Sequence, residues 1–183
     1  MLSDLVQTTL MLFDGVLFDQ SGTCPHCGGN LSGYDVKKKQ FAIMMEGEQK
    51  RVVSVRVKRF FCHQCRQVSL ADQPFYPDTR FGSPVVDLCV TLQETMPYSR
   101  VSSCLAEMGI VVDRWSVRNY VQKNHYIIPA AAMFNVRLPL SIVSLSSLAV
   151  GMTEGSRIDA QALLAVCGNP SGKKTPDDVP PHT

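Results

Sequence analysis

The sequence predicts an α+β fold, in which a small β module is followed by an all-α domain and a helical C-terminal region. Three observations lead to this prediction. Two Cys-x-x-Cys pairs enclose a stretch with the alternating pattern of strands, and residues 83–125 carry three helical apolar patterns with start and stop signals. The 183-residue chain is also 45% apolar, which is enough to form a core.

The β module is expected over residues 21–72, with strands at 41–45 and 51–61 joined by a turn at 47–49. In the second strand, Val53, Val55 and Val57 alternate with polar and basic residues. This period of two is typical of a strand with one buried face. One side of the hairpin should therefore pack, and the other should be cationic.

The cysteine pairs predict a metal site made by Cys24, Cys27, Cys62 and Cys65. Two intervening residues let both sulfurs of a pair face one ion, and four thiolates complete a tetrahedral zinc site. Such a site leaves no open position for water, so we expect one structural Zn²⁺ and a zinc-ribbon arrangement. The alternative is a set of ordinary buried cysteines or a redox pair.

The other cysteines, and the histidines near the two pairs, are not expected to be metal ligands. His26 and His63 lie inside the two pairs and could replace a cysteine ligand, but we expect them to be exposed. Cys89, Cys104 and Cys167 have no partner at ligand spacing and are interpreted as small core residues.

The charge is unevenly distributed. Residues 21–70 contain nine Lys and Arg against three Asp and Glu, a net charge of +6, whereas the whole chain carries +2 and the remainder therefore −4. A local basic surface suits a polyanion. We predict phosphate contacts from the basic side chains of the hairpin: Lys37, Lys38, Lys39, Arg56 and Lys58.

Three helices are predicted in residues 83–125. The first begins at Ser83-Pro84 and stops before Pro97, the second runs from about 99 to 108 and ends at Gly109, and the third runs from about 113 to 124. The last two and their short turn are typical of a helix-turn-helix. The outward face of the third helix would contact DNA through Arg114, Ser116, Arg118, Asn119, Gln122 and Lys123. The alternative is a plain helical pair with a solvated polar face.

The remaining segments carry weaker patterns. Residues 1–20 form an apolar lead-in that suits a helix or a strand pair equally, and the Pro- and Gly-containing segment 73–82 is predicted as a linker at a domain boundary. Residues 126–168 are predicted as a helical region whose last helix spans about 156–167, and 169–183 as a disordered tail.

Residues 21–125 resemble the N-terminal half of insertion-sequence transposases of the DDE type, in which a zinc ribbon precedes a helix-turn-helix. The resemblance lies in Arg59-Phe60-Phe61-Cys62-His63-Gln64-Cys65, in 75–81 leading to a helix, and in 98–121 with its Leu-Ala-Glu-Met-Gly-Ile core. In that family this half recognises the ends of the element. A separate RNase H-like domain with Asp, Asp and Glu binds two metal ions and cuts the strands.

That catalytic part has no counterpart in this sequence. The acidic residues after position 125 are Glu154, Asp159, Asp177 and Asp178, and the last two fall in the predicted tail. A two-metal nuclease needs a sheet that brings distant carboxylates together. We therefore expect a binding protein similar to the recognition half alone, and not an enzyme.

The sequence thus predicts a double-stranded DNA-binding protein that depends on structural zinc. The alternative is a protein-interaction adaptor that docks through the ribbon and the apolar stretches 130–150 and 158–166. A third hypothesis, with less support in the sequence, is an accessory subunit of a transposition machine. Residues 126–168 could also mediate self-association. Residues 1–20 lack the cationic start of a secretory signal, and 126–150 are too interrupted for a spanning helix, so a cytoplasmic protein with no membrane partner is expected.

Overall fold

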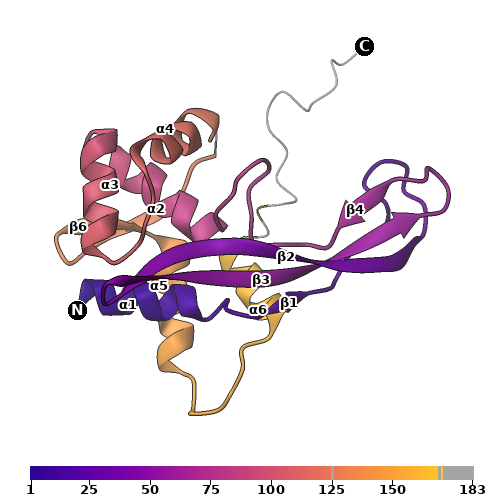
Figure 1. The fold of residues 1–183 in the computed structure, drawn as a ribbon, viewed down its shortest axis with the longest axis horizontal. Coiled ribbons are helices and arrows are strands. Elements are labelled where there is room, and N and C mark those ends of the chain that lie inside the picture. The colour runs from indigo at the N-terminus through magenta and orange to yellow at the C-terminus, as the bar shows by residue number, and fades with distance from the viewer. Residues whose placement is uncertain (125, 169, 171–183) are drawn as a thin grey trace.

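The computed structural model describes residues 1–124, 126–168 and 170 and contains six helices and two sheets, so the α+β prediction holds (Figure 1). The elements follow the order α1 (Leu2–Met11), β1 (Leu17–Phe18), β2 (Leu31–Glu46), β3 (Gln49–Cys62), β4 (Val68–Leu70), α2 (Ser83–Gln93), α3 (Tyr98–Glu107), α4 (Arg114–Lys123), β5 (Ala130–Met133), β6 (Val136–Pro139), α5 (Leu140–Val150) and α6 (Ala160–Cys167).

A long antiparallel hairpin of β2 and β3 runs the length of the molecule (Figure 1). Its register pairs Glu46 with Gln49 at the turn and Leu31 with Cys62 at the other end. The short strand β1 pairs in parallel with β3, and β4 pairs antiparallel with β3 near Cys62. The two predicted strands are confirmed, but β2 starts ten residues earlier than predicted because its Lys run hides the alternation of that half.

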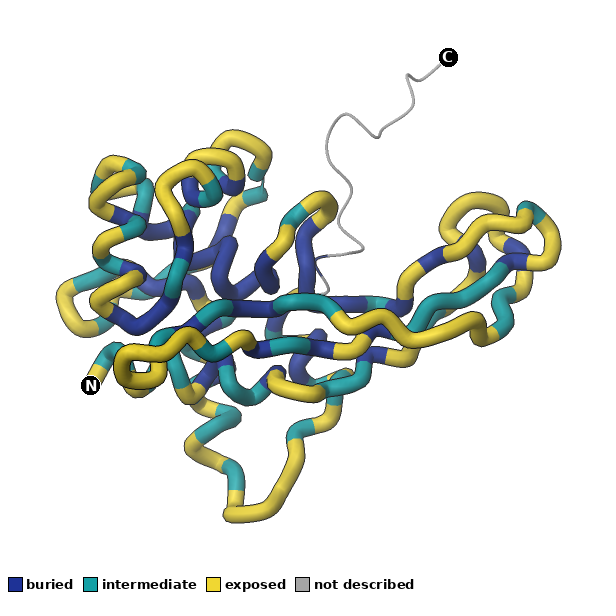
Figure 2. The backbone as a smooth tube through the Cα atoms, in the orientation of Figure 1, coloured by how far each residue is buried: buried dark blue, intermediate teal, exposed yellow. Residues whose placement is uncertain are grey.

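One half of the hairpin packs into the core. Val53, Val55 and Val57 are fully buried, as their alternation predicted, and Phe41 on β2 is buried beside them. The Phe41 ring stacks on Phe13 at 4.2 Å between centroids. Figure 2 shows the contrast along the hairpin, which is buried beside the helices and mostly exposed beyond them.

Helices α2, α3 and α4 pack together, and the signals predicted for their ends are confirmed except for the capping serine of α2, because Gly82 takes the N-cap position and Ser83 forms no capping hydrogen bond. Helix α2 begins at Ser83 with Pro84 in its first turn. Gly109 follows α3 with a φ of +79°, a left-handed conformation that glycine adopts without a side-chain penalty. The Asp113 side chain caps α4 by accepting a hydrogen bond from the backbone N–H of Ser116 at 2.9 Å.

The connection between α3 and α4 is hydrogen-bonded to strand β2. Ile110 forms an antiparallel bridge with Met44, the backbone N–H of Met45 donates to Gly109 O, and the N–H of Val111 donates to Ile43 O, the last two at 2.8 Å. These bonds fix the start of α4 relative to the packed half of the hairpin.

The segment 73–82, predicted as a linker, is instead part of the core. Phe75, Tyr76 and Phe81 are buried, and the buried side chains of the hairpin, of α1 and of the helices form one continuous cluster. Proline and glycine do mark irregular backbone here, but the three aromatic side chains give the segment 73–82, here called the aromatic loop, more apolar area than a solvated linker carries. The hairpin and the helices therefore share a core.

Both ends of the chain add to this core. Residues 1–20 form helix α1 and strand β1, which settles the alternatives left open by the sequence, and Val6, Leu10 and Phe18 are fully buried. The prediction of a helical region over 126–168 is wrong in its first part, where β5 and β6 form a hairpin. The two residues of its turn, Phe134 and Asn135, both have positive φ. This pair is not the Asn-Gly sequence that usually signals such a turn.

The last predicted helix is confirmed as α6, four residues shorter at its start and followed by Gly168 with a φ of +68°. The tail predicted over 169–183 lies, apart from residue 170, outside the described residues. Among the described helices, none combines the length and the apolar character needed to cross a bilayer.

Candidate metal centre and nucleic-acid interface

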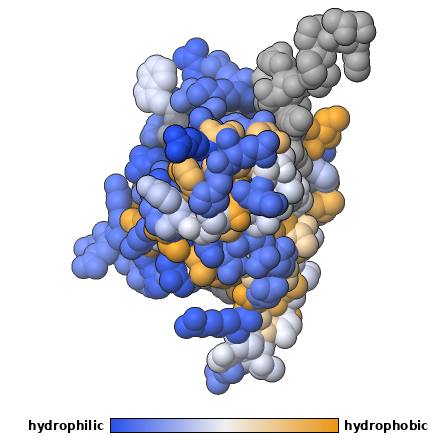
Figure 3. Space-filling view, turned by 90° about the vertical axis from the view of Figure 1, so that its right-hand side faces the viewer, coloured by the Kyte–Doolittle hydropathy of each residue, from blue (hydrophilic) through white to orange (hydrophobic). Residues whose placement is uncertain are grey.

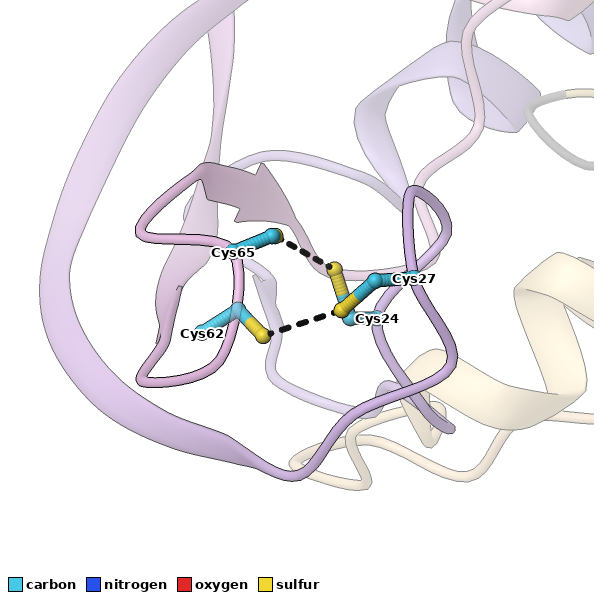
Figure 4. Close-up of side chains that lie close together, drawn as sticks. All are labelled: Cys24, Cys27, Cys62 and Cys65. Carbon is cyan, nitrogen blue, oxygen red and sulfur yellow. Dashed lines mark hydrogen bonds between the residues drawn. The ribbon is translucent and has the colours of Figure 1, made fainter.

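Four cysteine side chains converge at the end of the hairpin that lies farthest from the helices (Figures 1 and 4). Cys24 and Cys27 come from the loop before β2, and Cys62 and Cys65 from the end of β3 and the turn after it. All four sulfurs lie within 4.8 Å of one another. Across the site, the sulfur of Cys27 lies 3.5 Å from that of Cys62, and the sulfur of Cys24 lies 3.6 Å from that of Cys65.

The two Cys-x-x-Cys turns have the same backbone conformation. In the first, the N–H of Gly28 donates to Cys24 O, and in the second the N–H of Arg66 donates to Cys62 O, both at 2.8 Å. Gly28 and Arg66 both have positive φ, at 73° and 61°. The second turn thus holds an arginine in the left-handed region where the first has glycine, an arrangement that costs on the order of 1 kcal/mol unless the structure around it compensates.

Backbone amides point at the sulfurs. The N–H of Gly29 donates to Cys27 Sγ at 3.4 Å. The amides of Cys65 and Gln64, with the Cys27 side chain, lower the pKa of the Cys62 thiol to about 7 against the opposing effect of burial. The amide of Gln67 also lowers the pKa of Cys65, but burial and the three neighbouring thiols outweigh it and raise that pKa to about 12.

The sulfur geometry fits a metal ion. A tetrahedral centre with metal–sulfur bonds of about 2.3 Å places its sulfurs about 3.8 Å apart, close to the two distances across this site. A divalent cation would also supply the positive charge that lets four crowded thiols ionise together. The predicted ligand set is therefore brought into an arrangement that can hold one metal ion.

The residues around the cysteines agree with the remaining sequence predictions. His26 and His63 are exposed, as predicted, and His63 Nε2 lies 2.8 Å from Ser32 Oγ. Cys89 and Cys167 are buried on helices and Cys104 is half-buried, and none of the three belongs to the cysteine group.

The outward face of α4 carries most of the predicted DNA-contacting residues. Arg114, Arg118, Asn119, Gln122 and Lys123 are exposed, whereas Val117 and Tyr120 are buried and fix the rotation of the helix. Ser116 differs, because its hydroxyl donates to the Asp113 carboxylate at 2.7 Å. Ser116 therefore serves the start of the helix.

The part of the hairpin toward the cysteines, residues 31–40 of β2 and 56–62 of β3, is exposed or half-buried except for Val57 and Cys62 and is here called the arm. Lys37, Lys38 and Arg56 are exposed on it, and Lys58 is half-buried with its Nζ 5.4 Å from the Phe60 ring centroid. Viewed from the cysteine end, the surface is largely hydrophilic with hydrophobic groups interspersed (Figure 3).

Lys39 is set apart from these residues. Its Nζ donates to Gln73 Oε1 at 2.7 Å and lies 3.9 Å from the Phe75 ring centroid. Burial, with Lys37 nearby, lowers its pKa to about 8. Lys39 therefore ties the arm to the aromatic loop and is a poor candidate for a phosphate contact.

One surface residue was missed by the sequence reasoning. Trp115, on the second position of α4, is 64% exposed. The signal was available, because it is the only tryptophan in the sequence and it lies between Arg114 and Ser116 in a segment predicted to face outward.

Comparisons with protein-family models, with curated proteins and with solved structures find no match to this chain.

Proposed function

We propose that this chain binds double-stranded DNA, with α3 and α4 acting as a helix-turn-helix and one structural zinc ion holding the cysteine end as a zinc ribbon. In this proposal the protein acts by binding and carries out no strand cleavage. The observation that carries it is the exposed face of α4, whose rotation is fixed by buried Val117 and Tyr120.

The side chains of that face have the donors and acceptors that read base edges. An arginine such as Arg118 donates two hydrogen bonds to guanine, and an asparagine such as Asn119 pairs with the edge of adenine. The Asp113 cap and the bonds between 109–111 and β2 hold the helix in place. A reading helix needs such support, because base contacts tolerate little displacement.

Zinc is the metal that the four sulfurs favour. Tetrahedral sulfur sites bind zinc or iron, and in a zinc site four cysteines leave no position for water or substrate. The metal would therefore contribute folding free energy to the end of the arm. The exposed carboxylates of Glu154 and Asp159 lie outside this cluster, which is consistent with a non-catalytic metal.

The arm supplies a second, less specific contact. Lys37, Lys38 and Arg56 would neutralise phosphates, which strengthens binding to any sequence. Because α4 and the cysteine end lie at opposite ends of the molecule (Figure 1), a duplex that touches both must run along its long axis.

The adaptor alternative loses support from the packing of the C-terminal region. Leu138, Ile142, Leu145, Leu163 and Leu164, which that hypothesis would offer to a partner, are buried in the shared core. The side chains that remain exposed on the stretch 130–150 include Phe134, Leu140 and Val150, so a partner would find only part of the predicted apolar surface.

The test begins with selection from a random duplex library, which supplies the preferred site. We expect Arg118→Ala and Asn119→Ala each to weaken binding to that site by ~1–3 kcal/mol and to relax the consensus, with little change on other sequences. Arg157→Ala is the matched control, because Arg157 is exposed in the segment between α5 and α6.

Selection that yields no consensus, or a consensus and affinity unchanged in both α4 variants, would remove α4 as the reader. The adaptor hypothesis would then take its place.

A further inference from the structure

A groove beside the exposed face of α4 contains an indole ring, that of Trp115, which the proposed duplex recognition does not use. It has a volume of about 380 Å³ and is lined by Pro97, Tyr98 and Ser99 at the start of α3 and by Arg114, Trp115, Arg118 and Gln122 of α4. This volume falls within the range of ~300–1,000 Å³ found for small-ligand pockets. The groove thus has room for a planar group beside the indole ring.

Two guanidinium groups accompany the indole. The Cζ atoms of Arg114 and Arg118 lie 5.4 Å and 5.8 Å from the Trp115 ring centroid. Trp115 is 64% exposed, so its indole can be reached by a ligand. An open indole with flanking cations is suited to a molecule that carries both flat rings and negative charge.

The charges around the groove favour an anion. Among the described residues that line it, two are arginines and none is acidic. The nearby carboxylate of Asp113 accepts hydrogen bonds from Ser116, and Glu107 forms an ion pair with Arg100 at 3.3 Å. A protein partner could also use Trp and Arg, but it would need acidic groups to match this surface.

We propose that the groove between α3 and α4 binds an unpaired nucleotide of a DNA strand, with its base stacked on Trp115 and its phosphate held by Arg114. In a duplex the faces of the bases are covered by their neighbours, so an indole can stack only on a base that has left the helix. This inference rests on the proposed function: the preferred ligand is then a duplex with an adjoining unpaired extension.

The single tryptophan makes a direct measurement possible, because the intrinsic tryptophan fluorescence of this protein comes from Trp115 alone. The zinc-loaded full chain is titrated with a blunt duplex containing the selected site, the same duplex with an unpaired extension, and the extension strand alone. Affinity is measured independently by anisotropy of a label on the DNA.

We expect the extended duplex to quench the fluorescence and to bind roughly 5- to 150-fold tighter than the blunt duplex, as stacking of one base allows. Trp115→Ala should remove this preference and leave affinity for the blunt duplex within about two-fold. Trp115→Phe should retain part of the preference. Tyr34→Ala is the matched control, because Tyr34 is an aromatic residue of the arm that is 59% exposed.

The outcomes separate the two proposals. Equal binding of blunt and extended duplexes without quenching would overturn the stacking site and leave duplex recognition standing. Absence of binding to every oligonucleotide would overturn both, and a preference that survives in Trp115→Ala would place the unpaired strand elsewhere. Circular dichroism and zinc content verify that the variants are folded.

Discussion

The two ends of the β2–β3 hairpin are built on different physical principles. Near the turn at Gly47, the strands bury Phe41 and the valines of β3 against α1 and the aromatic loop. At the other end, Leu31, Phe60 and Phe61 are only half-buried, and the continuous core does not reach Cys24 or Cys62. One end is held by apolar burial, whereas the other brings four sulfurs together within 4.8 Å of one another.

The difference shows how a narrow structure can extend beyond a small core. A two-stranded ribbon alone is marginally stable in water, because it has too little apolar area to offset the entropy of ordering its chain. The packed end obtains that area from neighbouring elements. The cysteine end has few neighbours, so a bound metal would provide the missing free energy.

Substituting a cysteine at the metal-binding end of the hairpin should produce the largest loss of structure. We expect Cys62→Ser or Cys24→Ser to abolish binding of the metal, which we propose is one zinc per chain, and to unfold residues 21–36 and 58–70 while the helices stay folded. Elemental analysis measures the metal, and amide hydrogen exchange locates the loss of structure.

Cys104→Ser is the control, because Cys104 is half-buried on α3 and should not change the metal content. Less than about half an equivalent of any metal in freshly purified, reduced wild-type protein would contradict the prediction, since structural sites of this kind bind tightly.

Truncating a buried side chain at the packed end of the hairpin should instead destabilise the whole molecule. Phe41 has no exposed surface, stacks on Phe13 and meets the Phe75 ring edge-on at 5.8 Å. Phe41→Ala should lower the free energy of unfolding by about 3–5 kcal/mol through lost burial and a cavity. Thermal unfolding measures this loss, while the metal content should stay at the wild-type value. A variant that lost metal without losing global stability would show that the two ends are not held separately.

A subtler change at the same place tests the closeness of packing. A Cβ atom added at Gly82 would lie 2.0 Å from Cε2 of Phe41, at a backbone φ of −60° that any residue tolerates. Gly82→Ala should therefore destabilise by about 1–3 kcal/mol through steric overlap alone. Chemical denaturation measures it, with Gly22→Ala as control, because an added Cβ there meets nothing within 4 Å. Equal stability of the two variants would mean that the Phe41 ring can move aside.

The sequence predicted the parts of this fold that local chemistry determines. Paired cysteines at hairpin spacing, the alternation around Val55 and the signals at Pro84, Gly109 and Asp113 each act within a few residues. The burial of Phe75, Tyr76 and Phe81 was not predicted, because it depends on α1 and the hairpin, which lie far away in the sequence. The β5–β6 hairpin was missed because Phe134-Asn135 is an unusual turn pair.

The candidate site also contains some residues whose roles could be predicted from the sequence and others whose roles could not. The metal ligands could be predicted because ligand spacing in a Cys-x-x-Cys turn is a local property. The roles of Lys39 and Ser116 could not, because each depends on a partner in the folded chain, Gln73 for the first and the Asp113 carboxylate for the second. Exposure of Trp115 likewise follows from the rotation of α4 that Val117 and Tyr120 impose.

The smallest loss of stability is expected from a substitution at the start of α4, whose preceding segment is hydrogen-bonded to the packed end of the hairpin. Asp113→Ala removes the cap and should cost ~0.5–2 kcal/mol, measured by chemical denaturation at neutral pH. Hydrogen bonds from the Ser116 side chain and backbone hold the pKa of the Asp113 carboxyl below its ordinary value of 3.8.

The sign of the pH dependence follows from that direction. Because the pKa of the Asp113 carboxyl is lower in the folded chain than in the unfolded chain, the stabilisation by the cap is present when the pH is above the ordinary pKa of 3.8. It is lost as the pH falls through the folded-state pKa. The stability difference between wild type and Asp113→Ala should therefore shrink on acidification. A difference that grows as the pH falls would contradict the capping role.

The ladder between β2 and β3 also sets a length. From Ile43, which accepts a hydrogen bond from the segment before α4, to Leu31 beside the cysteines, the strand covers about 40 Å at ~3.3 Å per residue. One turn of B-DNA spans about 34–36 Å, so in the proposed DNA complex the two contacts would lie about one helical turn apart. Removing two residues from each strand would shorten this distance by about 7 Å and keep every side chain of the arm on its own face, whereas removing one from each would move every side chain of the arm to the opposite face.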